Sequence, residues 1–230
     1  MRLTLLSLPV VNERGFREAP DEKIASYPPR TQLNWKVFLQ FFTRPKIGRW
    51  ILVLLVYMMG TTIANTMFRP FLVDLGLSLA QIGLINGIAA FSAGFVGSFV
   101  GGFLVKILGR KRSLITLGGG MAIANATFII PTLGWTSIPI LYLVSMGFQF
   151  AYSMACIPMY TVMMDKSRLL TAGFDYTLQI SLVFVGSLTA GAISGFIANA
   201  IGYQGAFLIS ATLVLLSIVI IARVFDNDEL

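Results

Sequence analysis

The chain has 230 residues, of which 56% are hydrophobic and only 12% are charged, and its mean hydropathy is +0.81. This composition is too apolar for a soluble domain and indicates a membrane protein. The sequence holds no histidine and a single cysteine, Cys156. It therefore excludes Ser-His hydrolysis, most metal sites and a disulfide within the chain. We expect neither a metal nor a cofactor.

Six apolar runs are each long enough to cross a hydrocarbon core of about 30 Å. They cover residues 48–68, 79–108, 114–133, 138–164, 174–201 and 204–222. The runs leave no room for a soluble catalytic domain, so we do not expect an enzyme. The sequence predicts an all-α membrane protein. Its parts are a basic linker over residues 1–46, a six-helix transmembrane domain over 47–225 and a short tail over 226–230.

The net charge of +7 is placed as membrane topology requires, so we expect no nucleic-acid partner. Sixteen of the seventeen Lys and Arg residues lie at or before the start of the first run, around the junction of the second and third runs, between the fourth and fifth runs, or after the last run. Only Arg69 belongs to the opposite side. Basic residues concentrate on the cytoplasmic side of membrane proteins. We therefore expect both termini in the cytoplasm and the chain in the inner (plasma) membrane.

The linker over residues 1–46 allows more than one interpretation. Residues 3–11 are apolar but too short to span a bilayer, and the Asn-Glu-Arg that follows does not resemble a signal-peptide cleavage site. We interpret them as the remnant of a preceding helix that leads into a cytoplasmic loop. Residues 34–43, rich in Trp and Phe, are either an interfacial amphipathic helix or a linker that touches the membrane.

A glycine-bounded basic turn separates the second and third runs. It contains Gly102, Leu104, Gly109, Arg110, Lys111 and Arg112. This pattern resembles the loop between the second and third helices of a six-helix half in major facilitator transporters. The family usually has Asp at the fifth position of the motif, where this chain has Lys106. We expect the three consecutive basic residues to anchor the topology, because Lys106 cannot supply the acidic latch of the family.

Two further segments resemble branches of the same superfamily. Pro70–Gly76, read as Pro-Phe-Leu-x-Asp-Leu-Gly, is similar to muropeptide and siderophore permeases. Asp175–Gln179, read as Asp-Tyr-Thr-Leu-Gln, resembles siderophore permeases, and muropeptide permeases and acetyl-CoA transporters have related forms. The resemblance covers about residues 30–225. It implies the second, C-terminal half of a twelve-helix carrier.

Polar side chains form a row on each of two predicted helices. Tyr57, Thr61, Asn65 and Arg69 follow one another at steps of four, whereas Tyr142, Ser145, Gln149, Tyr152, Cys156 and Tyr160 follow at steps of three or four. Each row is either the wall of a polar cavity or an ordinary helix–helix seam. Our cavity candidates are Tyr57, Asn65, Arg69, Gln149, Tyr152 and Gln179. We expect Arg69-Pro70 to end the first helix, and Arg69 to meet Asp74 or to line the outer mouth.

Small residues suggest how the helices pack. The pairs Gly83/Gly87 and Gly97/Gly101 each predict close approach of another helix, whereas the runs 114–133 and 204–222 are expected to face lipid. Residues 102–109 also recur at 195–202, an offset of 93 residues, with glycine at both ends. Since the two copies run in opposite directions, this predicts a 3+3 inverted repeat.

These observations favour the C-terminal half of a secondary transporter that works by alternating access. We expect the solute to be a siderophore or a related medium-sized molecule, with a muropeptide or an acyl-CoA-like solute as the alternatives. The expected partners are the lipid bilayer, the solute and a separate N-terminal six-helix half, with a homodimer ranked lower. The alternative function is a membrane fragment or interaction subunit that transports nothing.

Overall fold

The computed structural model describes residues 35–224, and this part of the chain is helical throughout its regular elements. The helices are α1 (Trp35–Phe42), α2 (Ile47–Asp74), α3 (Leu79–Gly83), the π-helical η2 (Leu84–Ala89), α4 (Ala90–Leu108), α5 (Arg110–Thr127), α6 (Ile129–Thr132), α7 (Ile138–Asp165), the 3₁₀-helical η3 (Leu169–Thr171) and α8 (Ala172–Val224). The predicted remnant at 3–11, most of the linker and the tail lie outside the described residues.

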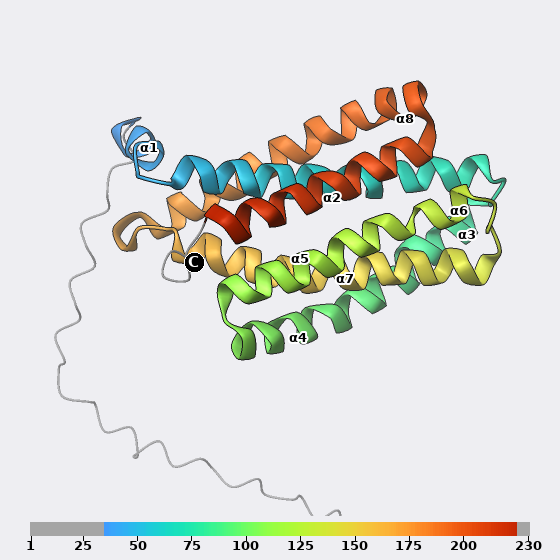
Figure 1. The fold of residues 1–230 in the computed structure, drawn as a ribbon, viewed down its shortest axis with the longest axis horizontal. Helices are drawn as coiled ribbons and strands as arrows, with labels where there is room; N and C mark the ends of the chain where they lie inside the picture. Colours follow the sequence, from blue (N-terminus) through green and yellow to red (C-terminus); the bar gives the residue numbers. More distant parts are fainter. Residues whose placement is uncertain (1–34, 225–230) are drawn as a thin grey trace, which may run out of the picture. The chain divides into compact units, whose positions relative to one another are not determined.

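Five helical stretches within residues 35–224 are long and apolar enough to cross a membrane. They are Ile47–Asp74, Leu79–Leu108, Arg110–Thr132, Ile138–Asp165 and Leu169–Arg223. The last stretch covers two of the predicted runs. Its helix α8 is interrupted at Gly202, which has φ 74° and ψ 172°, and the ribbon turns back on itself there (Figure 1). We call residues 172–201 the first arm of α8 and residues 203–224 its second arm.

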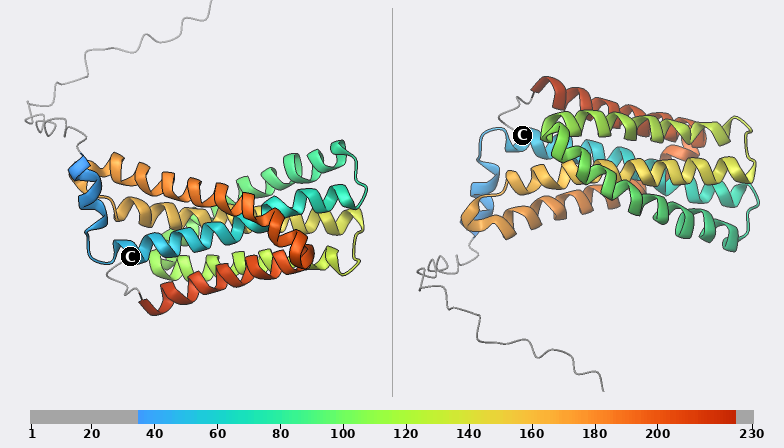
Figure 2. Two further views of the ribbon diagram at one scale, coloured as in Figure 1. Left: turned by 90° about the horizontal axis from the view of Figure 1, so that it is seen from above. Right: turned by 90° about the horizontal axis from the view of Figure 1, so that it is seen from below.

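The long helices lie side by side, and α1 runs across one end of them (Figure 2). Helix α2 packs mainly on α8, α4 packs on α7, and α5 packs on both α7 and α8. Phe128, which follows α5, lies in the aromatic core. Its ring centroid is 4.4 Å from that of Phe68, 4.8 Å from that of Phe148 and 5.3 Å from that of Phe207.

Helices α4 and α7 approach closely through glycine. A side chain at Gly97 or Gly101 would collide with the backbone carbonyls of Phe150 and Met154, so this predicted close-packing pair is confirmed. The prediction for Gly83 and Gly87 is wrong, because neither has a neighbouring atom within 4 Å of where a Cβ would lie. Both precede the part of the helix that carries the glycine contact with α7.

Three expectations about individual helices need correction. Helix α2 does not end at Arg69-Pro70 but continues to Asp74, because a proline removes a single backbone donor and membrane helices tolerate that loss. Helix α5 buries one face, which includes Leu117 and Met121. The second arm of α8 also buries a face, and its Ser210 donates a hydrogen bond of 2.7 Å to the Gly60 carbonyl. A helix that is apolar all round gives no sign in the sequence of which face it buries.

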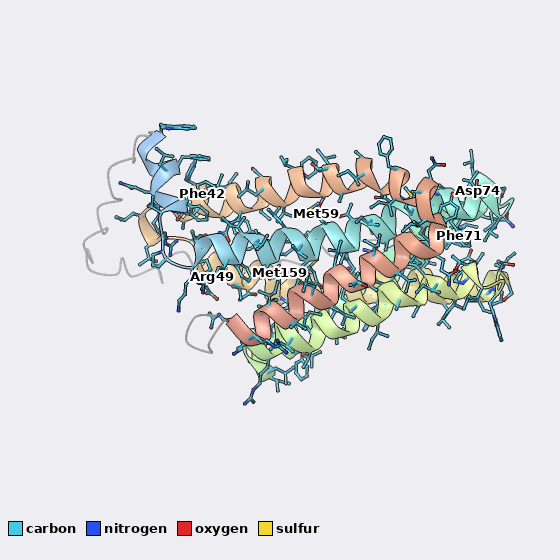
Figure 3. The ribbon with its side chains drawn as sticks, turned by 45° about the horizontal axis from the view of Figure 1, so that its top comes forward. Phe42, Arg49, Met59, Phe71, Asp74 and Met159 are labelled. Carbon is cyan, nitrogen blue, oxygen red and sulfur yellow. The ribbon has the colours of Figure 1, made fainter. Side chains whose placement is uncertain are left out.

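The basic residues gather at one end of the bundle. Helix α1, the α4–α5 turn, the α7–α8 connection and the last turn of α8 all lie there (Figure 1). The start of α2 with Arg49 lies at this end too, and the other segments include Lys106, Arg112 and Arg223. We call this the basic end, and Asp74 lies at the opposite end of α2 from Arg49 (Figure 3).

Candidate functional site: a polar pocket between α2, α4 and α7

A pocket of about 190 Å³ lies between α2, the η2–α4 segment and α7, in the half of the bundle farther from the basic end. It is lined by Asn65, Phe68, Arg69, Asn86, Ala90, Phe91, Phe128, Ser145, Phe148, Gln149 and Tyr152. Its lining combines amide, hydroxyl and guanidinium groups with aromatic rings. This combination can hold a solute that has both hydrogen-bonding groups and flat apolar surfaces.

Four of the six candidate residues come together at this pocket. Asn65 and Arg69 lie one turn apart on α2, and Gln149 and Tyr152 lie one turn apart on α7. The two helices thus present polar side chains to a common space, as their spacing in the sequence predicted. That these side chains contact a solute stays a prediction.

Tyr57 lies outside this pocket, although it belongs to the same polar row of α2. Its side chain is buried, and a Cβ on Gly118 would lie 3.7 Å from its ring. The hydroxyl has no hydrogen-bond partner within the described part of the chain. The i, i+4 row drifts around the helix, so its first member reaches the interior of the bundle and its last two reach the pocket.

Gln179 also lies outside the pocket, so the sequence-based preference for it as a cavity residue is corrected. It is fully buried beside the basic end. Its Oε1 accepts a hydrogen bond of 2.9 Å from the Trp50 indole N–H, and its Nε2 donates one of 3.0 Å to the Met163 carbonyl. These contacts join α2, α7 and α8 and leave the amide no face toward the pocket. Gln179 therefore holds helices together and does not line the pocket.

Asn86 lines the pocket although the sequence analysis did not select it. It lies in the π-helical segment η2, a helix type that occurs frequently at functional sites. Its Oδ1 accepts a hydrogen bond of 2.9 Å from the Ser145 hydroxyl, whereas its buried Nδ2 has no partner among residues 35–224. A buried amide donor without a partner costs free energy unless water or a ligand satisfies it. The lone asparagine in an apolar run was the only signal in the sequence.

Arg69 is the one ionisable cation in the pocket lining. Among the described residues it forms none of the ion pairs, since those involve Arg44, Arg110 and Arg168. Asp74, its expected alternative partner, accepts a hydrogen bond of 2.5 Å from the Tyr203 hydroxyl instead. Of the two expected settings for Arg69, the contact with Asp74 is not among the described ion pairs, and Arg69 lines the pocket. A guanidinium there suits an anionic group of a solute.

The glycine-bounded turn has a defined geometry at the basic end. Gly109 has φ 76° and ψ 176° and joins α4 to α5, whereas Gly102 is exposed, with no atom within 4 Å of where a Cβ would lie. Arg110 forms a bidentate ion pair with Asp165 at the end of α7, with Nη2 donating to Oδ1 at 3.0 Å. This acidic partner belongs to the same chain and joins the start of α5 to the end of α7. Lys111 and Arg112 continue the basic turn into α5.

A second ion pair closes the α7–α8 connection. Asp175 is fully buried and accepts hydrogen bonds from Arg168 through Nε at 2.8 Å and Nη2 at 2.7 Å. These bonds raise the pKa of the Arg168 guanidinium above its already high value. Thr171 also donates to Asp175, at 3.2 Å, and Arg44 Nη1 lies 4.0 Å away. Asp175 thus fixes the start of α8 through side chains as well as through the helix dipole.

The described residues contain no group of three or more His, Cys, Asp or Glu side chains that could hold a metal ion.

A family model gives the class of the protein. The model described as Major Facilitator Superfamily matches residues 3–175 and 50–229 in two overlapping alignments. Together these matches cover nearly the whole chain, so the chain belongs to the major facilitator superfamily. With its apolar helices of membrane-spanning length, it is a multi-pass membrane protein.

Individual relatives point to one branch of this family. The chain is 24% identical over 178 residues to the protein named transporter AmpG 4 of Rickettsia conorii, which covers 77% of this chain and 43% of the relative. It is 25% identical over 176 residues to the anhydromuropeptide permease of Escherichia coli K12, which covers 74% of this chain and 35% of the relative. The chain thus aligns with less than half the length of these relatives. The muropeptide-permease part of the sequence resemblance is supported, and the siderophore part is not.

Proposed function

We propose that the chain is the C-terminal six-helix half of a secondary transporter rather than an enzyme. The observation that carries this proposal is the polar pocket, in which Arg69 and Asn86 lie among aromatic side chains within a bundle of apolar helices of membrane-spanning length. Polar groups at membrane depth are expensive and mark solute paths. The pocket, in a chain of a transporter family, therefore serves to bind the solute that is carried by alternating access.

The six-span architecture is part of this proposal. Helix α8 has 53 residues, which would extend roughly 80 Å at 1.5 Å per residue. That is far longer than the about 30 Å of a hydrocarbon core, so we propose that its two arms cross separately. The turn at Gly202 has nearly the same backbone angles as the turn at Gly109, 93 residues earlier. Both glycines occupy the same position in the predicted 3+3 inverted repeat.

The packing of the helices also supports the inverted repeat. If α2 corresponds to α7, and α4 to the first arm of α8, then the α4–α7 contact should have a counterpart between α2 and that arm. Gly186 of the first arm lies close to Leu55 and Met59 of α2. At the same offset of 93, α4 and the first arm also carry matching phenylalanines that are exposed on both helices. The matched pairs are Phe91 with Phe184 and Phe103 with Phe196.

The orientation follows from the basic end. Because sixteen of the seventeen Lys and Arg residues fall on one side in a six-span chain, we propose that this side is the cytoplasm of the inner membrane. Both ends of the six-helix domain then lie in the cytoplasm. The pocket lies toward the outer face, where Arg69 can meet an incoming solute.

We propose a separate N-terminal six-helix half as the partner that completes the pocket. The relatives have more than twice the aligned length, and each half of such a carrier contributes one wall of the solute path. The glycine face of α4 is not available for this partner, because α7 already occupies it. The exposed phenylalanines of α4 and of the first arm of α8 are available to contact this partner. A homodimer, which could place two copies in parallel, ranks below this arrangement.

The solute that fits best is a muropeptide. One relative is named an anhydromuropeptide permease, and a molecule that joins sugar rings to a peptide carboxylate offers partners for the aromatic walls and for Arg69. We therefore place a muropeptide before the siderophore that the sequence alone favoured, and before an acyl-CoA-like solute.

The test uses cells that lack their own anhydromuropeptide permease. Uptake of radiolabelled anhydromuropeptide is measured with this chain alone, with the N-terminal half of the E. coli permease alone and with both. The proposal expects uptake only with both, and loss of that uptake when the chain carries Arg69→Gln. Uptake by the chain alone would overturn the partnership. If both halves together give no uptake, and the purified chain does not bind anhydromuropeptide, the alternative of a non-transporting interaction subunit replaces this proposal.

A further inference from the structure

Helix α1 is held in a fixed position across the basic end of the bundle (Figure 2). Lys46 adopts the left-handed conformation at φ 66° directly after Pro45, which turns the chain sharply from α1 into α2. Phe41 is fully buried in the core of the bundle. Arg44 Nη1 donates a hydrogen bond of 2.6 Å to the Lys166 carbonyl at the end of α7. These contacts fix which side of α1 faces the bundle.

Another side of α1 is apolar and uncovered. Trp35 is 68% exposed, Leu39 48% and Phe42 40%. The ring of Phe38 stacks on Trp35 with centroids 4.9 Å apart and lies 5.1 Å from the ring of Phe42, so the three aromatic side chains form a continuous ladder. Gln40 is also exposed but lies on the polar side of the helix. The helix therefore has one apolar side against the bundle, a second apolar side against its surroundings and a polar side.

The surroundings of α1 are rich in positive charge and in further apolar groups. Arg49, Lys106 and Arg112 are exposed at the same end of the bundle. In the α7–α8 connection at this end, Leu169 is 98% exposed and Leu170 is 71% exposed. An apolar stripe that includes Trp, next to exposed basic side chains at the end of a membrane-spanning bundle, matches the chemistry of a lipid–water interface.

We propose that α1 lies in the plane of the membrane surface at the basic end, with the Trp35–Leu39–Phe42 side in contact with lipid and the basic end against anionic headgroups. The apolar side then lies roughly 5–10 Å into the boundary between headgroups and acyl chains. Because α1 is tied to α2 and α7, this contact sets the depth at which the bundle sits in the bilayer. The inference rests on the membrane location of the chain and is independent of what the chain transports.

Site-directed spin labelling tests this placement with two neighbouring positions. The full chain carries Cys156→Ala and either Leu39→Cys or Gln40→Cys, with a nitroxide attached, in vesicles of phosphatidylcholine alone or mixed with phosphatidylglycerol. Molecular oxygen, which concentrates in lipid, and a water-soluble nickel chelate report the two environments. Labelling Leu39→Cys with Cys156 retained guards against misfolding of the Cys156→Ala chain, because Cys156 is buried.

The proposal expects the label at position 39 to be several-fold more accessible to oxygen than to the nickel chelate, and the label at position 40 to show the reverse. Shielding of position 39 in both vesicle types supports contact through the apolar side alone. Shielding of position 39 only in vesicles with phosphatidylglycerol supports a membrane contact of α1 that also requires the basic end to bind anionic headgroups. Equal access of the nickel chelate to both positions would place α1 in water and overturn the proposal. So would shielding of both positions from both reagents, since protein would then cover the helix.

Discussion

Arg69 owes its importance to the absence of an acidic partner within residues 35–224. Other described arginines pair with Asp165 or Asp175, whereas the carboxylate nearest to Arg69 in sequence, Asp74, is engaged by Tyr203. An exposed guanidinium that lines a pocket and has no acidic partner among the described residues can pair with an anionic group of a solute. The residue therefore carries the anion specificity that we assign to the pocket.

Replacing Arg69 by Gln should weaken the binding of anhydromuropeptide without unfolding the chain. A charge-assisted hydrogen bond contributes about 1.5–3 kcal/mol, which corresponds to roughly a 10- to 100-fold loss of affinity. Equilibrium binding of the radiolabelled solute to this chain together with its N-terminal half measures the loss of affinity. Arg69→Lys should retain part of the affinity, and Arg49→Gln, at the opposite end of α2 (Figure 3), should retain all of it. Unchanged affinity in Arg69→Gln would remove this residue from the site.

Two glutamines that the sequence offered as cavity candidates, Gln149 and Gln179, should differ in what their substitution changes. Gln149→Leu removes a polar group from the pocket wall and should lower solute affinity with little change in stability. Gln179→Leu leaves the Trp50 N–H and the Met163 carbonyl without these partners. That loss should reduce the free energy of unfolding by about 1–3 kcal/mol while affinity stays the same. Thermal unfolding and solute binding, measured on both variants, separate the two roles, and lost affinity in Gln179→Leu alone would reverse our assignment.

Only those pocket residues that share a helix face with other polar residues could be predicted from the sequence. The i, i+4 and i, i+3 steps identified Asn65, Arg69, Gln149 and Tyr152, because neighbours on one helix face are fixed by local geometry. The position of Gln179 depends on its hydrogen bond with Trp50, 129 residues away in the sequence. No pattern in either segment predicts that contact. Asn86 was missed because no row of polar residues on its helix marks the face that reaches the pocket.

At the scale of the elements, the close contact of α4 with α7 fixes the third wall of the pocket. Gly94 lies against Gln149 and Ser153, and Gly97 and Gly101 lie against the backbone of α7. The pair Gly97/Gly101 was predictable from its spacing, since small residues four apart open a helix face to close approach. The buried faces of α5 and of the second arm of α8 were not, because apolar residues surround both helices.

Gly97→Ala should destabilise the bundle, because the added methyl group would have to displace the Phe150 carbonyl. Overpacking of this kind costs about 1–3 kcal/mol. Gly102→Ala is the matched control on the same helix, since nothing lies within 4 Å of its added methyl group. It should be neutral or stabilise the helix by up to about 1 kcal/mol through its higher helix propensity. Thermal unfolding in detergent compares the two, and equal stability of both variants would contradict the packing that we describe.

For the whole molecule, the sequence indicated most of the architecture and little of its energetics. Apolar runs and the placement of Lys and Arg depend on the bilayer alone, so the positions of the long helices could be predicted from them. The contacts at the basic end could not. Arg110 meets Asp165 and Arg44 meets the Lys166 carbonyl across 55 and 122 residues of sequence. Such pairings depend on which helices become neighbours.

We propose that the chain crosses the membrane six times, with α8 turning at Gly202 on the outer side. Thiol labelling with a membrane-impermeant reagent tests it most directly, on intact cells that express Cys156→Ala chains with one new cysteine each. We predict that Ser137→Cys and Gln204→Cys, both at exposed positions, react from outside the cell. Lys106→Cys and Leu170→Cys, exposed at the basic end, should react only after the membrane is permeabilised. Reaction of Gln204→Cys from the cytoplasmic side alone would contradict the six-span architecture and the inverted repeat built on it.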